Sequence, residues 1–252
     1  MTGVASGVTS AGASAGASAG NWVAGAGATL RVHDTHIYDG ATFTGGGTYI
    51  NQGNGMFAHN TGPVSIDFAE VGMNSNVGGT GALTFTGHIN WTNGGFSINV
   101  TLAAGCVTDM NSGNIGIGGN TTTNYGTLNV NANFTLSAGQ LDNYGLISLN
   151  GPYTIGIYYG TPGIFNHGTV KKPATSAGTY NMAVPLTNYS DGSVIVENGE
   201  LYVGSDFTNS GSLSVSAGAS STTSGALSPP RSTNAAYVSR AIQPSNLESL
   251  RS

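Results

Sequence analysis

Residues 124–130 read NYGTLNV, a turn-like triplet followed by alternating apolar and polar residues. Asn and Gly both tolerate a positive φ, and the Asn side chain can bond nearby backbone groups, so the triplet predicts a sharp turn. A period of two then sends Leu128 and Val130 to a buried face and Thr127 and Asn129 to solvent. The heptapeptide therefore predicts a turn and a short, half-buried strand.

The same pattern returns four times, as NYGLISL (143–149), NHGTVKK (166–172), SDGSVIV (190–196) and NSGSLSV (209–215). The glycines of successive copies are 19, 23, 24 and 19 residues apart, which gives a period near 21 with small loop insertions. The predicted structural turns are Asn124 and Gly126, Asn143 and Gly145, Asn166 and Gly168, Asp191 and Gly192, and Asn209 and Gly211.

Apolar residues occupy the second and fourth positions after the glycine in four copies: Leu128 and Val130, Ile147 and Leu149, Val194 and Val196, and Leu213 and Val215. Lys172 breaks this pattern, because it stands where the other copies carry Val or Leu. A lone buried ammonium is costly. We therefore expect the strand after Gly168 to end early, or the Lys172 side chain to extend to the surface.

A unit of 21 residues with two or three strands and no helical segment cannot bury its apolar face alone, but copies of it can stack. The period predicts an all-β fold, a single-stranded parallel β-helix (β-solenoid) with coils of about 21 residues. The alternative is an antiparallel β-sandwich, in which turns such as Asn198–Gly199 join hairpins. The expected divisions are a low-complexity Gly/Ala/Ser leader (1–20), the β-solenoid (21–216) and a flexible tail or linker (217–252).

The composition limits the possible classes of protein. Hydrophobic residues make up 38% of the 252 positions, charged residues only 7%, and the formal net charge is −5. This is not the composition of a disordered chain. Basic residues are too few for nucleic acid as a partner, and no apolar run is long enough to span a membrane as a helix. The single cysteine, Cys106, is expected to be a small buried hydrophobe.

The stretch 164–215, IFNHGTVKKPATSAGTYNMAVPLTNYSDGSVIVENGELYVGSDFTNSGSLSV, resembles the Asn-x-Gly repeats of large bacterial exported β-helix proteins. These include autotransporter passengers and filamentous-haemagglutinin-like adhesins. The resemblance covers residues 122–216 well and 40–121 in style only. It implies a parallel β-helix on the cell surface or secreted, and it brings no catalytic residues with it.

We therefore expect a structural or adhesive repeat segment of an exported bacterial surface protein, without chemistry of its own and without a cofactor. The expected partners are host or environmental glycans or other cell-surface proteins, and the chain is expected to be a monomer or part of a longer protein. A carbohydrate-active β-helix enzyme (a polysaccharide lyase or hydrolase) and a glycan-binding module are the alternatives.

Three sets of residues are candidate sites. Tyr125, Tyr144 and Tyr189 follow the turn Asn in three copies, where a stacked row would either bind sugar rings or only stabilise the coils. Carboxylates near one turn, in the enzyme alternative, are Asp191, Glu197 and Glu200. Potential metal ligands crowd in VHDTHIYD (32–39) as His33, Asp34, His36 and Asp39. On a regular strand His33 and His36 face opposite sides, so we favour a polar cap on the first coil over a metal site.

Overall fold

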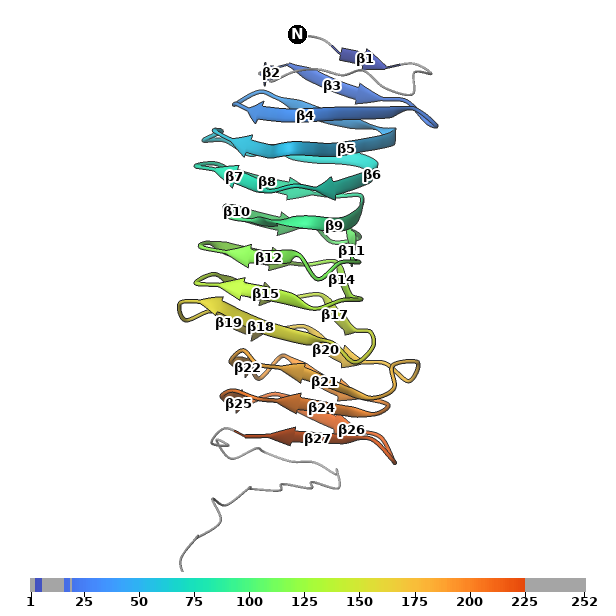
Figure 1. Ribbon diagram of the computed structural model, residues 1–252, viewed down its shortest axis with the longest axis vertical. Helices are drawn as coiled ribbons and strands as arrows, with labels where there is room; N and C mark the ends of the chain where they lie inside the picture. Colours follow the sequence, from blue (N-terminus) through green and yellow to red (C-terminus); the bar gives the residue numbers. More distant parts are fainter. Residues whose placement is uncertain (1–2, 6–15, 19, 225–252) are drawn as a thin grey trace, which may run out of the picture.

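Every secondary-structure element in the described part of the chain is a β-strand. The computed structural model describes residues 3–5, 16–18 and 20–224. Its strands stack along one axis into a rod (Figure 1), and each pairing between strands is parallel. The predicted parallel β-solenoid is confirmed and the sandwich is excluded. The described ranges contain no helical segment that could span a membrane.

Each coil contributes a strand segment to three faces, here called A, B and C, and each segment pairs with its equivalent one coil away. Face A contains β1 (Gly3–Ala5), β3 (Asn21–Ala24), the first parts of β5 (Thr42–Ala58) and β6 (Ser65–Asn74), β8 (Ala82–Phe85), β10 (Asn99–Leu102), β13 (Thr121–Asn124), β16 (Gln140–Asn143), β19 (Gly163–Asn166), β22 (Leu186–Asn188) and β25 (Phe207–Asn209).

Face B follows face A along each coil. It contains the first part of β4 (Thr29–Ile37), the middle of β5, the second part of β6, the start of β9 (His88–Phe96), β11 (Val107–Met110), β14 (Thr127–Val130), β17 (Leu146–Leu149), β20 (Thr169–Lys172), β23 (Ser193–Val196) and β26 (Ser212–Val215).

Face C closes the coil. It contains β2 (Gly16–Ser18), the ends of β4 and β5, β7 (Val77–Gly79), the end of β9, β12 (Ile115–Gly118), β15 (Phe134–Ser137), β18 (Thr154–Tyr159), β21 (Thr179–Met182), β24 (Glu200–Val203) and β27 (Ser220–Thr223).

The sheet extends past both ends of the predicted solenoid. β1 and β2 lie within the predicted leader, and β27 lies beyond residue 216. Such segments can join the sheet without an apolar pattern because the pairing uses backbone groups, which Gly, Ala, Ser and Thr carry as well as Val does. Residues 1–2, 6–15, 19 and 225–252 of the predicted leader and tail lie outside the described residues.

The predicted alternation on face B is confirmed. The apolar pairs of three copies are fully buried: Leu128 and Val130, Ile147 and Leu149, and Val194 and Val196. Leu213 and Val215 are only partly buried, in the last described coil of this face. Cys106 is buried as predicted, and burial raises the pKa of its thiol.

The asparagines of the repeat lie inside the solenoid, at the end of the face A strands, rather than on an exposed turn. Each side-chain Nδ2 donates to the Oδ1 of the next asparagine, at 2.6 or 2.7 Å, through Asn124, Asn143, Asn166, Asn188 and Asn209. Nδ2 of Asn143 also donates to the carbonyl oxygens of Gly145 and Thr169, both at 3.2 Å. These five residues, the asparagine ladder, satisfy one another in the core, as buried amides must.

The predicted turn at Asp191 and Gly192 is present, closed by the Gly192 N–H donating to the carbonyl oxygen of Tyr189 at 2.9 Å, but Asp191 is not a member of this ladder. Two extra residues separate the asparagine and the glycine in this copy, so Asn188 takes the buried place and pairs with Asn166 and Asn209. Asp191 is exposed instead. An alignment on glycine alone could not locate the insertion.

The repeat glycines are required by close approach between coils, which corrects the predicted reason. None of Gly126, Gly145, Gly168, Gly192 and Gly211 has a positive φ. A Cβ on Gly145 would lie 2.1 Å from the carbonyl oxygen of Gly126, and a Cβ on Gly168 would lie 2.2 Å from that of Gly145. Gly145, Gly168 and Gly211 therefore each lie against the glycine of the preceding copy, whereas a Cβ on Gly126 or Gly192 would overlap Cys106 or Asn166.

Lys172 contradicts both outcomes expected for it. β20 continues through Lys172, whose side chain is fully buried and whose register partner in the next coil is Val196. Nζ donates to the carbonyl oxygen and to Oγ of Ser176, at 2.6 and 2.8 Å. The loop after β20 thus brings hydrogen-bond acceptors to the ammonium group inside the protein. Burial lowers the pKa of Lys172.

We expect Gly145→Ala to lower the free energy of unfolding by about 3 kcal/mol, because its Cβ would overlap backbone that cannot move without separating two coils. Gly25→Ala is the matched control: Gly25 lacks a positive φ, and a Cβ added to it would meet no atom within 4 Å. Its effect should stay within about 0.5 kcal/mol. Urea unfolding followed by circular dichroism measures both, and equal losses would contradict the stacking role.

We expect Asn143→Leu to cost about 2–4 kcal/mol of unfolding free energy, since it leaves buried partners in two neighbouring coils unsatisfied. Asn124→Leu is the comparison at the end of the ladder. The equivalent residue one coil earlier is Leu102, so this change only extends an apolar column by one coil. Its cost should be roughly half that of Asn143→Leu. The same unfolding measurement tests the ladder, which a larger loss at Asn124 would refute.

Candidate functional site

The three predicted tyrosines lie in one row at the corner between faces A and B, and a histidine completes the row. Tyr125 stacks on Tyr144 with ring centroids 5.1 Å apart, and Tyr144 stacks on His167 at 4.8 Å. His167 stacks on Tyr189 at 4.2 Å. These four residues, the aromatic stack, immediately follow four consecutive members of the asparagine ladder. The buried amides thus set the spacing of the exposed rings.

His167 was not among the residues predicted for this row, which were all tyrosines. The signal was present in the sequence, because His167 fills the variable place of NHG as Tyr fills that of NYG. Its Nδ1 lies 3.0 Å from a carboxylate oxygen of Asp191, which comes from the two-residue insertion one coil later. The insertion therefore supplies the stack with an acidic partner.

The geometry of the stack limits how it could bind a sugar. Interplanar angles between neighbouring rings are 6–19°, so the two inner rings, Tyr144 and His167, are covered on both faces and expose only their edges. The exposed fractions of Tyr125, Tyr144 and Tyr189 are 49%, 47% and 38%. A pyranose ring stacks on an aromatic face, which the inner rings do not offer. Carbohydrate binding at this row stays a prediction, and stabilisation of the coils follows directly from the contacts.

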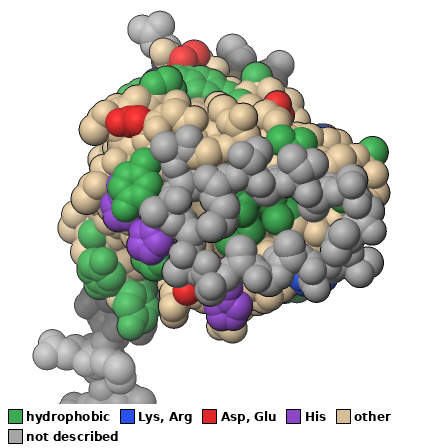
Figure 2. Space-filling view, turned by 90° about the horizontal axis from the view of Figure 1, so that it is seen from above, with side chains coloured by type: hydrophobic (Ala, Val, Ile, Leu, Met, Phe, Trp, Pro, Cys, Tyr) green, Lys and Arg blue, Asp and Glu red, His purple; other side chains and the backbone are tan. Residues whose placement is uncertain are grey.

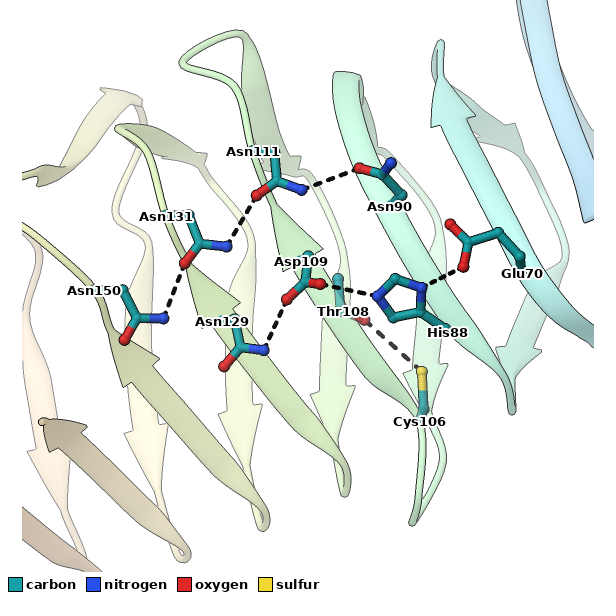
Figure 3. Close-up of polar contacts among 10 residues, drawn as sticks. All are labelled: Glu70, His88, Asn90, Cys106, Thr108, Asp109, Asn111, Asn129, Asn131 and Asn150. Carbon is teal, nitrogen blue, oxygen red and sulfur yellow. Dashed lines mark hydrogen bonds and ion pairs between the residues drawn. The ribbon is translucent and has the colours of Figure 1, made fainter. Parts of the chain in front are cut away.

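A second cluster of polar side chains lies on face B, and no pattern in the sequence predicted it (Figure 3). His88 is bracketed by two carboxylates: Nδ1 contacts Glu70, and Nε2 lies 2.9 Å from Oδ2 of Asp109. Asn129 extends the row by donating to Oδ1 of Asp109 at 2.7 Å. Glu70, His88 and Asp109, here called the acid–histidine cluster, come from three successive coils.

The carboxylates raise the pKa of His88, with the hydrogen bond to Glu70 as the largest cause. An imidazole whose two nitrogens both face carboxylates can donate from both only as the imidazolium. Neither nitrogen is then free to accept a proton from a bound substrate. The cluster can link three coils by charge, whereas general-base catalysis would first require that link to break.

A row of asparagines runs beside the acid–histidine cluster (Figure 3). Asn111 donates to Asn90 at 3.0 Å, Asn131 to Asn111 at 2.9 Å, and Asn150 to Asn131 at 2.9 Å. The residues in these contacts are 19–21 positions apart in sequence. Because this separation varies, the contacts could be predicted from the sequence only if the length of each coil were known.

The potential metal ligands of residues 33–39, for which a polar cap was favoured over a metal site, do not gather into a group of three or more. His33 and His36 both point outward, which corrects the expectation of opposite sides, because a register shift between Val32 and Asp34 interrupts the alternation. Asp34 accepts from the Asn54 backbone N–H, and Asp39 accepts from those of Thr61 and Gly62. Nowhere in residues 20–224 do three or more His, Cys, Asp or Glu side chains gather as metal ligands.

The three carboxylates of the enzyme alternative bind different partners. Asp191 pairs with His167, and Glu197 forms an ion pair with Lys171 at 2.8 Å and accepts from the Ala174 backbone N–H. These two contacts lower the pKa of Glu197, and the contact with Lys171 has the larger effect. Glu200 accepts hydrogen bonds from Thr179 and Thr222, in the coils before and after its own. Each carboxylate is thus already engaged along the axis of the rod.

At the end of the rod seen from above, the visible described surface is mostly uncharged polar and backbone atoms, with hydrophobic, acidic and histidine side chains scattered around its edge (Figure 2). Comparisons of the chain with protein-family models, with curated proteins and with solved structures found no match. The candidate sites must therefore be judged from their own geometry.

The raised pKa of His88 predicts a pH-dependent contribution to stability. Because the folded-state pKa lies above the unfolded value, the contribution is fully present below about pH 6.5 and is lost as the pH rises through the folded-state pKa. Above about pH 6.5, the unfolding free energy of the unchanged protein should fall as His88 loses its proton, and His88→Gln should remove this fall. The amplitude should stay below about 1 kcal/mol, since the site is partly solvated.

Unfolding in urea across that pH range measures the effect. The exposed His33 offers a matched control, and His33→Gln should leave the fall in place. A His88→Gln protein whose pH profile overlays that of the unchanged protein would show that the acid–histidine cluster carries no such linkage.

Proposed function

We propose that this chain is a structural or adhesive repeat segment of an exported bacterial surface protein, acting by presenting a long, repetitive face. The observation that carries the proposal is the asparagine ladder, in which the buried amides of five coils bond to one another at 2.6–2.7 Å. A ladder of this kind holds successive coils in one register along the axis. A fixed register supports the role of a stiff rod.

The exterior supports the same proposal, because charged and aromatic side chains also bond from coil to coil. The aromatic stack joins four coils, the acid–histidine cluster joins three, and Glu200 links the coils on either side of its own. Groups used in this way strengthen the rod, and the rings of the aromatic stack recur in four successive coils. Partners of the proposed adhesive face are glycans or other cell-surface proteins.

The export part of the proposal rests on the resemblance of residues 122–216 to repeats of bacterial surface proteins. It is tested separately, by raising antibodies against the full chain. They should label intact, unpermeabilised cells of the source organism, and labelling that requires permeabilisation would contradict export.

Adhesion is tested with beads that carry the purified full chain. We expect them to attach to cell monolayers or polysaccharide-coated surfaces more than beads carrying an unrelated protein at equal density. Tyr144→Ala and Glu197→Gln should each leave attachment within about twofold, because a repetitive face distributes its contacts. Pulling single chains along the long axis tests the mechanical role, and should give stepwise release of coils rather than one cooperative collapse.

The same protein, incubated with a panel of polysaccharides, separates the proposal from the enzyme alternative. We expect no release of reducing ends, with or without calcium. Depolymerisation that Glu197→Gln abolishes would overturn the proposal in favour of a carbohydrate-active enzyme. A chain that neither attaches to any surface nor resists load would refute both the adhesive and the structural role.

A further inference from the structure

A groove on face C lies apart from the aromatic stack and the acid–histidine cluster. It runs from Asn76 across the end of β9, β12 and β15 to Tyr158 and Tyr159 of β18, and its volume is about 580 Å³. That volume lies within the range of roughly 300–1,000 Å³ typical of small-molecule sites. Four steps between coils, of about 4.8 Å each, give it a length of about 19 Å.

Two of the glycines that line the groove, Gly116 and Gly118, are not required by the fold. Gly116 and Gly118 face outward on β12 and have no positive φ. A Cβ on Gly116 would have its nearest neighbour at 3.5 Å, and a Cβ on Gly118 at 3.7 Å, which are ordinary contacts. They differ in this from the repeat glycines, where a Cβ does not fit. Their missing side chains leave the sheet bare, and this hollows face C.

The rim of the groove is formed by the irregular strand β18. Its register against β15 shifts between Leu136 and Ser137, which leaves Tyr158 as an extra residue between Ile157 and Tyr159. Tyr158 is 77% exposed and Tyr159 is 57% exposed, the two highest values among the large hydrophobic side chains of the described chain. Their rings meet edge to face, at an interplanar angle of 71°, so neither covers the other as the rings of the aromatic stack do.

The backbone beside this rim is held in an unfavourable conformation. Ala138, directly after β15, is the one non-glycine residue in the described ranges with a positive φ, 52°. Its N–H donates to the carbonyl oxygen of Tyr159 at 2.9 Å, which ties the rim to the floor. Bulges and strained residues concentrate where a side chain is directed toward a function. The register shift and the strained Ala138 both lie where β15 and β18 pair.

We propose that this groove binds a neutral oligosaccharide, with Tyr158 and Tyr159 packing on pyranose rings and Asn76, Ser97, Asn114 and Thr135 offering hydrogen bonds to hydroxyl groups. No residue that lines the groove in the described chain is charged. Uronic-acid chains, phosphates and basic peptides would therefore find no opposite charge there. This binding site goes beyond the rod function and does not depend on export or on adhesion.

Isothermal titration of the full chain with cellohexaose, xylohexaose and chitohexaose tests the proposal, with hexagalacturonate as the anionic control. We expect saturable binding of at least one neutral hexamer. Tyr158→Ala should weaken it about tenfold by removing a ring face. Gly116→Thr should weaken it at least as much by filling the floor, and a β-branched residue suits a strand, so the fold should persist.

Tyr144→Ala is the matched control, since it removes an exposed tyrosine at another corner of the rod and should leave the affinity unchanged. Circular dichroism and the unfolding midpoint confirm that each variant is folded. The proposal is overturned if none of the neutral hexamers binds, if only hexagalacturonate binds, or if binding survives both Tyr158→Ala and Gly116→Thr. These outcomes leave bead attachment and mechanical strength, the tests of the rod function, unaffected.

Discussion

The structure depends on one constraint: each coil must follow the path of the coil before it, displaced along the axis by one strand spacing. Backbone pairing between coils requires it on all three faces, because a parallel strand bonds only to a neighbour in matching register. The asparagine ladder enforces the register from inside, through amides that donate to the next coil at 2.6–2.7 Å. The repeat glycines enforce it at the adjacent corner, where only bare backbone fits.

This constraint explains why insertions are tolerated at some places and not at others. The coil after Asn188 carries two extra residues, yet Asn188 and Gly192 both keep their places, and the insertion projects outward with Asp191. The loop after Lys172 is likewise an insertion, and it supplies Ser176 to the buried ammonium. Extra residues are thus accommodated at corners, while the ladder positions stay fixed.

Local alternation was enough to predict the repeat strands of face B and their buried residues, because both follow from neighbours in sequence, and the spacing of the repeated glycines predicted the coil length. The same information could not distinguish a turn asparagine from a buried one, since Asn124 meets its partner Asn143 only when coils stack. It assigned the repeat glycines to positive φ, although their role lies in a contact with the coil before. Lys172 was misjudged for the same reason, because its partner Ser176 lies in a loop that has no pattern of its own.

The candidate sites fall into two groups, those in the regular part of the repeat and the groove at the irregular strand β18. Where the repeat is regular, polar and aromatic groups bond to their equivalents in the next coil, and the inner faces of Tyr144 and His167 are covered by their neighbours in the stack. Regularity that strengthens a rod thus removes the free groups that a ligand needs. Binding groups are left free where the repeat is broken, as at β18. This strand pairs with β21 only through Thr154 and Ile155, and its Tyr158 side chain is exposed. In a solenoid of this kind, the departures from the period are therefore the places to search for specificity, and the period itself accounts for strength.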